Sequence, residues 1–210
     1  MTFLTLAQIR AALALPGFDA EAAQRLMAPR PRAMRRSERR AGSPRQASVL
    51  VLLYPLDGEL AVVLVRRAAH PQDVHSGQIG LPGGAREPGE TALQAAMREA
   101  REELGLREPV DVLGQLTQVY IPPSDFEVTP IVGHVALHPV WQPDAAEVVE
   151  VIECPLAWLL DDARKVVEEW PVGASSMHVP WYNIAGHKVW GATAIIFSEL
   201  EQRLRLVLEL

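Results

Sequence analysis

The sequence predicts an α/β domain with a mixed β-sheet, preceded by a helical extension, and three observations support this. Two apolar runs, 47–54 and 59–67, have the composition of strands and are joined by turn residues, which predicts a hairpin. Segment 91–104 has helical periodicity. Strands and helices do not alternate strictly along the chain, which favours an antiparallel or mixed sheet flanked by helices.

Composition narrows the class of protein. The chain has 210 residues, of which 49% are hydrophobic, enough to form a sizeable core. Its net charge of −6 argues against general nucleic-acid binding, because a phosphate backbone would be repelled. The single cysteine, Cys154, has no partner for an internal disulfide or a paired-cysteine zinc site. We therefore expect no nucleic-acid partner and a reducing, cytoplasmic location.

The first 46 residues differ from the rest. Segments 5–15 and 20–27 are expected to be short helices separated by Pro16-Gly17, and an arginine-rich stretch covers 30–45. We therefore expect residues 1–46 to form a helical, arginine-rich extension and residues 47–210 to form the main domain. Arg10 interrupts the early apolar run, so a signal peptide is not expected, and no segment has the apolar length of a membrane span.

After the predicted hairpin, a loop over 68–90 is rich in glycine and proline and leads into the helix 91–104, which Gly105 should terminate. Further strands are expected at 111–120, 128–137, 148–155, 164–169 and 178–183, with a short helix at 156–162 and a helix from residue 191 onward.

The helix over 91–104 has one apolar stripe and an acidic edge. The stripe consists of Leu93, Ala96, Met97, Ala100 and Leu104. Glu99, Glu102 and Glu103 fall beside it, although like charges at helical spacing cost roughly 0.2–0.5 kcal/mol per pair. A solvated face paired with Arg98 and Arg101 is one interpretation. A divalent cation such as Mg²⁺, which prefers oxygen ligands, would instead explain why the acids are grouped.

The spacing of residues before and within this helix identifies a motif. Gly84 is followed after five residues by Glu90, after seven more by Arg98-Glu99, and then by Glu102-Glu103 and Gly105-Leu106. This pattern resembles the Nudix box, the signature of the Nudix hydrolases, at every fixed position. The resemblance implies an α/β/α sandwich and hydrolysis of a nucleoside diphosphate linked to another group.

The resemblance also implies roles for individual residues. Glu99 and Glu103 would be the principal ligands of Mg²⁺ or Mn²⁺, and Glu102 would be a third ligand or the base that activates water. Arg98 would orient a glutamate through charge-assisted hydrogen bonds. Glu90 would brace the loop, and Gly105 would end the helix.

The segment upstream of the box resembles the coenzyme A pyrophosphatase branch of the family. The matching residues are Arg66 or Arg67, Gly77, Gln78 and the run Leu81-Pro82-Gly83-Gly84. Alanine replaces the usual serine after the arginine, and Gln72 or Asp73 falls where a second arginine is often found. Segments downstream extend the resemblance over about residues 47–200.

The expected activity is therefore metal-dependent cleavage of coenzyme A or its acyl derivatives into 3′,5′-ADP and a phosphopantetheine fragment. Hydrolysis of ADP-ribose, a nucleotide sugar or a dinucleotide is the alternative within the same family. A nucleotide-binding module without turnover is a third alternative, which the presence of every box glutamate disfavours. The sequence leaves the oligomeric state open.

Several other residues have two interpretations. Trp190, Ala194 and Phe197 are expected in the core rather than in a base-stacking platform, because large apolar residues at helical spacing usually pack inside. Glu127 and Glu147 follow the box and are expected to be solvated rather than catalytic. Phosphate-contacting roles are open for His70, His75 and the arginines at positions 30, 32, 35, 36, 39, 40 and 45.

Overall fold

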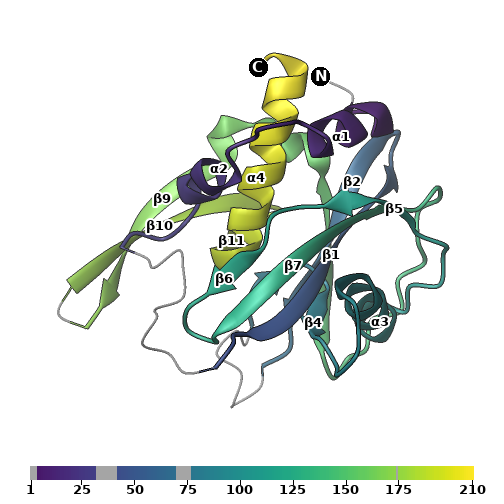
Figure 1. Ribbon diagram of the computed structural model, residues 1–210, viewed down its shortest axis with the longest axis horizontal. Helices are drawn as coiled ribbons and strands as arrows, with labels where there is room; N and C mark the ends of the chain where they lie inside the picture. The colour runs from purple at the N-terminus through teal and green to yellow at the C-terminus, as the bar shows by residue number, and fades with distance from the viewer. Residues whose placement is uncertain (1–3, 32–41, 70–76, 174) are drawn as a thin grey trace.

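The computed structural model describes residues 4–31, 42–69, 77–173 and 175–210 (Figure 1). Its α-helices are α1 (Leu6–Leu13), α2 (Ala20–Leu26), α3 (Ala92–Leu104) and α4 (Gly191–Leu208), and two 3₁₀ helices cover Leu156–Leu160 and Asp162–Arg164. Within these described residues, no helix has the length and apolar character needed to cross a membrane.

The larger sheet is mixed, as the sequence predicts. Its strands are β1 (Arg45–Leu56), β2 (Glu59–Arg67), β3 (Ile79–Gly80), β4 (Gly83–Ala85), β5 (Asp111–Gln115), β6 (Val119–Ile121), β7 (Phe126–His134) and β8 (Val148–Pro155). The order β3-β2-β1-β7-β5 forms the main path, while β4 pairs with β1, β6 with β7 and β8 with β2. The β1 and β7 strands are parallel, and the hairpin of β1 and β2 is antiparallel.

A second, three-stranded antiparallel sheet consists of β9 (Lys165–Val172), β10 (Ser175–Ile184) and β11 (His187–Trp190). The predicted strands at 164–169 and 178–183 are confirmed but are longer than expected. The sequence prediction missed β11, and it expected one helix where two 3₁₀ helices occur. The predicted strand 111–120 is divided into β5 and β6.

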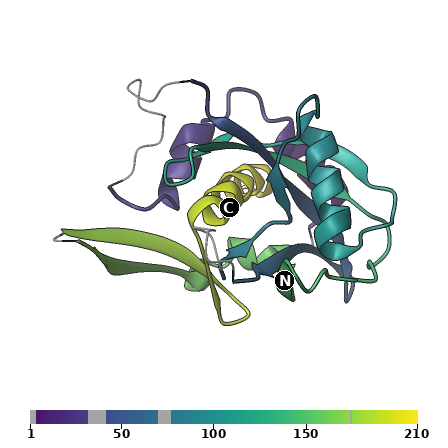
Figure 2. The same ribbon diagram turned by 90° about the horizontal axis from the view of Figure 1, so that it is seen from below.

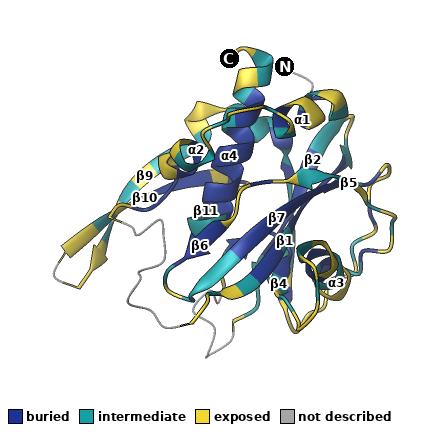
Figure 3. Ribbon diagram, in the orientation of Figure 1, coloured by how far each residue is buried: buried dark blue, intermediate teal, exposed yellow. Residues whose placement is uncertain are grey.

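The central strand β1 separates two cores. Leu50, Leu52 and Tyr54 pack in the cluster that contains the buried face of α3, whereas Val51 and Leu53 pack in the cluster that contains α4. This division follows the alternation of side chains along a strand. Figures 1 and 2 show α3 and α4 on opposite sides of the sheet, and Figure 3 shows its central strands as mostly buried. The predicted α/β/α sandwich is therefore confirmed.

The helix α3 begins and ends as the sequence predicts. Thr91 caps it in a capping box with Gln94, and Gly105 ends it with φ of 67°. The predicted stripe is wrong at one position: Leu93 is 37% exposed, whereas Ala95 is buried. The buried face is rotated so that it also includes Glu103, whose side chain is 2% exposed.

The N-terminal helices pack against α4. Gln24 on α2 donates to Glu199 at 2.9 Å, and the Ser198 hydroxyl donates to the Ala23 carbonyl at 2.7 Å. The Arg203 guanidinium donates to the carbonyl of Ala12 at 3.2 Å. The two predicted helices are therefore confirmed, and they help to cover the helix that completes the sandwich.

Candidate functional site

The strand β4, the loop 86–91 and α3 are held together by Arg98. Its guanidinium donates to Glu90 Oε1 at 2.8 Å, to Glu99 Oε1 at 2.8 Å and to Glu102 Oε2 at 2.9 Å. It also donates to the carbonyl of Ala85 at 3.0 Å. One arginine thus connects the strand, the loop and two carboxylates on its own helix. These contacts are charge-assisted, which makes them stronger than neutral hydrogen bonds.

Glu90 is anchored within the loop. Hydrogen bonds from Arg98, followed by the backbone N–H of Glu87, lower the pKa of Glu90 to about 2. In addition, the Arg86 guanidinium donates to the Glu90 carbonyl at 2.6 Å. The contacts of Glu90 are thus with the loop and with Arg98, and they place it apart from the acidic cluster described next.

Three carboxylates from two parts of the chain lie together. Glu99, Glu103 and Glu147 each offer an oxygen, and these oxygens lie within 4.8 Å of one another. Glu147 precedes β8, and its carbonyl accepts a hydrogen bond from the N–H of Ala68 at 2.7 Å. Glu147 was expected to be solvated, and the structure leaves it exposed but places its carboxylate in the cluster. No motif in the sequence connects it to the helix.

The two glycines of β4 fit closely against this cluster. The N–H of Gly83 donates to Glu103 Oε2 at 2.9 Å. A Cβ on Gly84 would overlap the carboxylate of Glu99, whereas a Cβ on Gly83 would overlap the carbonyl of Ser48 on β1. Glycine at position 84 therefore lets the strand lie against Glu99, and glycine at position 83 lets the strand pair with β1.

Burial gives the cluster its electrostatic character. It raises the pKa of Glu103 to about 7, although the Gly83 N–H and Arg67 oppose this shift. Burial also raises the pKa of Glu99, against the opposing effect of Arg98. Arg67 donates to Glu103 Oε1 at 3.2 Å. Carboxylate oxygens are the donors that Mg²⁺ prefers, so this donor set fits a hard divalent cation that would favour the charged form of the acids.

The other predicted site residues are placed as follows. The side chain of Glu102 is 55% exposed, pairs with Arg98 and is not part of the group of three. Arg66 pairs with Glu150 at 2.8 Å and not with a carboxylate of the acidic cluster. Gly77 adopts a positive φ of 70°, and the Gln78 carbonyl accepts from the N–H of Arg67 at 3.1 Å.

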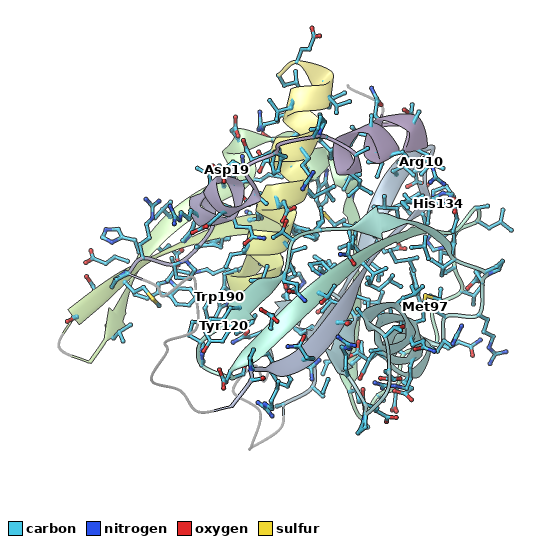
Figure 4. All side chains as sticks on the ribbon, viewed as in Figure 1. Arg10, Asp19, Met97, Tyr120, His134 and Trp190 are labelled. Atoms are coloured by element: carbon cyan, nitrogen blue, oxygen red, sulfur yellow. The ribbon has the colours of Figure 1, made fainter. Side chains whose placement is uncertain are left out.

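A cavity of about 640 Å³ lies beside the glycine strand β4. Its walls come from Pro29 and Pro31, the strands β1 to β4, the hairpin of β6 and β7, β10 and the start of α4. Arg67, Gln78, Gly83 and Gly84 line it. Trp190, labelled in Figure 4 at the start of α4, also lines it and is only half-buried, whereas Ala194 and Phe197 are fully buried as expected.

The remaining predicted residues that the structure describes lie outside the acidic cluster. Glu127 lies on β7 rather than in a loop, where it accepts from Gln46 at 3.1 Å. Arg45 lies over the ring of Phe126, 4.0 Å from its centroid, and Arg30 bridges to β10 through backbone hydrogen bonds. His70, His75, Gln72, Asp73 and the arginines at 32, 35, 36, 39 and 40 lie outside the described residues.

Comparison with known proteins agrees with this geometry. Residues 44–171 match the family described as the NUDIX domain. The chain is 35% identical over 170 residues to a Nudix hydrolase named NudL from Pectobacterium atrosepticum, covering 74% of this chain and 81% of that protein. It is 34% identical over 157 residues to the human mitochondrial coenzyme A diphosphatase NUDT8, covering 73% and 66% of the two chains.

Similarity to a third relative is more local. Nudix hydrolase 3 from Caenorhabditis elegans is 42% identical over 90 residues, which is 42% of this chain and 37% of that protein. The chain thus spans little more than a third of the nematode relative and just under two thirds of the human one. Among solved structures, a Nudix hydrolase from M. smegmatis, RenU, has a similar fold, with a TM-score of 0.53, 24% identity and coverage of 84% and 94%. The chain therefore belongs to the Nudix hydrolase family.

Proposed function

We propose that this enzyme hydrolyses the pyrophosphate bond of coenzyme A or its acyl derivatives, giving 3′,5′-ADP and 4′-phosphopantetheine or its acylated form. The observation that carries this proposal is the acidic cluster against Gly83 and Gly84, which also line the cavity. The upstream residues that resemble the coenzyme A pyrophosphatase branch support the choice of substrate, as does similarity to a protein named coenzyme A diphosphatase.

The residues of the cluster would hold Mg²⁺ or Mn²⁺. Glu99, Glu103 and Glu147 are the candidate ligands, because their carboxylate oxygens already converge. A divalent cation at this position supplies neutralisation of the charge that develops on the phosphoryl oxygens and the leaving group during attack by water.

Other residues of the site orient a ligand, shape the strand beside it and accept a proton. Arg98 fixes the carboxylate of Glu99 through a hydrogen bond of 2.8 Å, so the ligand is oriented before substrate arrives. The absence of a side chain on Gly84 leaves room for the Glu99 carboxylate beside β4. Glu102 is exposed next to this cluster and remains our candidate for the group that accepts a proton from water.

A substrate panel tests the proposal. Purified protein with Mg²⁺ or Mn²⁺ is incubated with coenzyme A, octanoyl-coenzyme A, ADP-ribose and a dinucleotide, and the products are identified by mass. We expect 3′,5′-ADP from both coenzyme A species, and ¹⁸O-labelled water will show which phosphorus is attacked. Rapid cleavage of ADP-ribose with intact coenzyme A would replace the proposed substrate by the alternative one.

A matched pair of variants tests the site. Glu103→Gln removes one charge from the cluster and should lower kcat/KM at least roughly 100-fold, because a lost ligand should cost more than a lost outer contact. Glu169→Gln changes an exposed glutamate on β9 and should have no effect. Unchanged activity in Glu103→Gln would show that the cluster is not the metal site.

A further inference from the structure

The cavity beside β4 has an apolar lining that the diphosphate chemistry does not use. Apolar side chains dominate its walls, including Ile121, Phe126, Trp190 and Ile196. Among the described residues that line it, Arg67 alone carries a formal charge, and its guanidinium already donates to Glu103 at 3.2 Å. The volume of about 640 Å³ is in the range of pockets that hold drug-sized ligands.

The cavity and the acidic cluster share a wall. Gly83 lines the cavity, and its N–H donates to Glu103. Gly84 also lines the cavity and lies against Glu99. Arg67 reaches both regions, since it lines the cavity and contacts Glu103. A substrate whose diphosphate lies at the acids can therefore extend one of its two ends into the cavity.

The charges of the lining distinguish between these two ends. The nucleotide end of coenzyme A carries a 3′-phosphate, and burial of such a dianion requires cationic or several donating groups. Among the described lining residues, the only cation is the Arg67 guanidinium, which is already paired with the Glu103 carboxylate. The pantetheine end is uncharged, and an attached acyl chain is apolar, so its transfer from water into this cavity is favourable.

Building on the function proposed above, we propose that this cavity binds the acyl-pantetheine arm, and that acyl-coenzyme A with a medium-length aliphatic chain is preferred over free coenzyme A. Gln78 and Thr193 are polar residues in the lining that can serve the amides of the arm. The hydrophobic residues around them contact the acyl chain of the substrate and set its preferred length.

Gly80 offers a way to fill the cavity without strain. It lies on β3, and its φ is outside the left-handed region. A Cβ built on it meets only Thr193 Oγ1, at 3.9 Å, which is an ordinary contact. A β-branched side chain suits a strand, so Gly80→Val should fold while occupying part of the cavity. Ala163→Val, at an exposed position in the second 3₁₀ helix, is the matched control.

Binding is measured by titration calorimetry in EDTA, which separates it from metal and from catalysis. The probes are acetyl-pantetheine, octanoyl-pantetheine and 3′,5′-ADP. We expect octanoyl-pantetheine to bind at least about tenfold more tightly than acetyl-pantetheine, since each buried methylene contributes favourably. Gly80→Val should weaken the binding of octanoyl-pantetheine about tenfold, and Ala163→Val should leave this affinity unchanged.

A second variant keeps the test valid if Gly80→Val does not fold. Met177 lines the cavity from β10 and is only half-buried, so Met177→Ala should enlarge the cavity without unfolding the protein. We expect the kcat/KM ratio of dodecanoyl- to octanoyl-coenzyme A to rise in this variant. A ratio equal to that of the unaltered protein would contradict an acyl chain in this cavity.

The outcomes separate this inference from the proposed function. Equal affinity for the acetyl and octanoyl probes, with coenzyme A still cleaved, would overturn the inference and leave the function intact. Tighter binding of 3′,5′-ADP that Gly80→Val weakens would assign the cavity to the nucleotide and also overturn it. Chain-length-dependent binding of the probes without cleavage of any coenzyme A species would support the cavity assignment and overturn the function.

Discussion

Glu103 is the residue at which the requirements of stability and of function conflict most directly, because a proposed metal ligand is buried. Its side chain is 2% exposed and accepts hydrogen bonds from the Gly83 N–H and from Arg67. Even so, burial raises its pKa from 4.5 to about 7. In the metal-free protein, the folded state therefore holds a proton at pH values where the unfolded chain has released it.

This shift predicts the direction of a pH dependence. Below about pH 4.5, both states of the chain carry the Glu103 proton, and the group contributes nothing to the pH dependence. As pH rises from 4.5 to 7, the unfolded state releases the proton first, so stability falls. The loss should reach roughly 2–4 kcal/mol, at about 1.4 kcal/mol per pKa unit.

The measurement is the free energy of unfolding by urea in EDTA, between pH 5 and pH 8. Glu103→Gln removes the titrating group and should remove this part of the slope. Glu102→Gln changes an exposed carboxylate on the same helix and should retain it. If the slope of Glu103→Gln equals that of the unaltered protein, Glu103 is not the group that titrates.

Two fully buried serines provide a second comparison. Within the described parts of the chain, Ser48 Oγ on β1 has no hydrogen-bond partner, whereas Ser198 Oγ on α4 donates to the carbonyl of Ala23 at 2.7 Å. An unpaired buried hydroxyl carries a desolvation cost of about 1–3 kcal/mol, and a paired one contributes about 1 kcal/mol. We expect Ser48→Ala to be neutral or stabilising.

The matched change, Ser198→Ala, should destabilise by about 1–2 kcal/mol, because it leaves the Ala23 carbonyl without its donor. Thermal unfolding of both variants, with saturating EDTA, gives the two values. A large destabilisation in Ser48→Ala would show that its hydroxyl does have a partner in solution.

At the scale of elements, the strand β4 shows how one element serves two requirements. A Cβ on Gly83 would overlap the backbone of β1, and its φ of 150° is strained for other residues. A Cβ on Gly84 would instead overlap the far end of the flexible Glu99 side chain, which can move. Neighbouring glycines are therefore required for different reasons, one for pairing and one for the cluster.

Alanine at each position should separate these requirements. Gly83→Ala should destabilise the fold by several kcal/mol, since backbone has to shift. Gly84→Ala should cost less than about 1 kcal/mol but displace Glu99 and weaken Mn²⁺ binding, as followed by electron paramagnetic resonance. Unaltered Mn²⁺ affinity in Gly84→Ala would mean that Glu99 does not bind the metal.

Across the whole molecule, local sequence patterns predicted most of the helices and strands. They did not predict the contacts between residues that are far apart in the sequence. The spacing of apolar residues and the Gly105 end were sufficient to predict α3, because a helix depends on nearby residues. The burial of Glu103 depends on how α3 lies on the sheet, and no local pattern specifies that rotation. The cavity is likewise assembled from segments between Pro29 and Ile196, which only the finished fold brings together.

The set of metal ligands also depends on a long-range contact that the sequence motif does not specify, and this difference can be tested. The motif predicts Glu99, Glu102 and Glu103, whereas the structure groups Glu99 and Glu103 with Glu147, which depends on the Ala68 contact before β8. Ligand binding to the folded state raises stability, so Mg²⁺ should raise the Tm of the unaltered protein. Grouping of the oxygens further implies that Glu147→Gln will reduce this rise more than Glu102→Gln, because Glu102 faces Arg98 and solvent. Thermal scans over a series of Mg²⁺ concentrations measure both variants, and a larger loss in Glu102→Gln would favour the ligand set that the motif predicts.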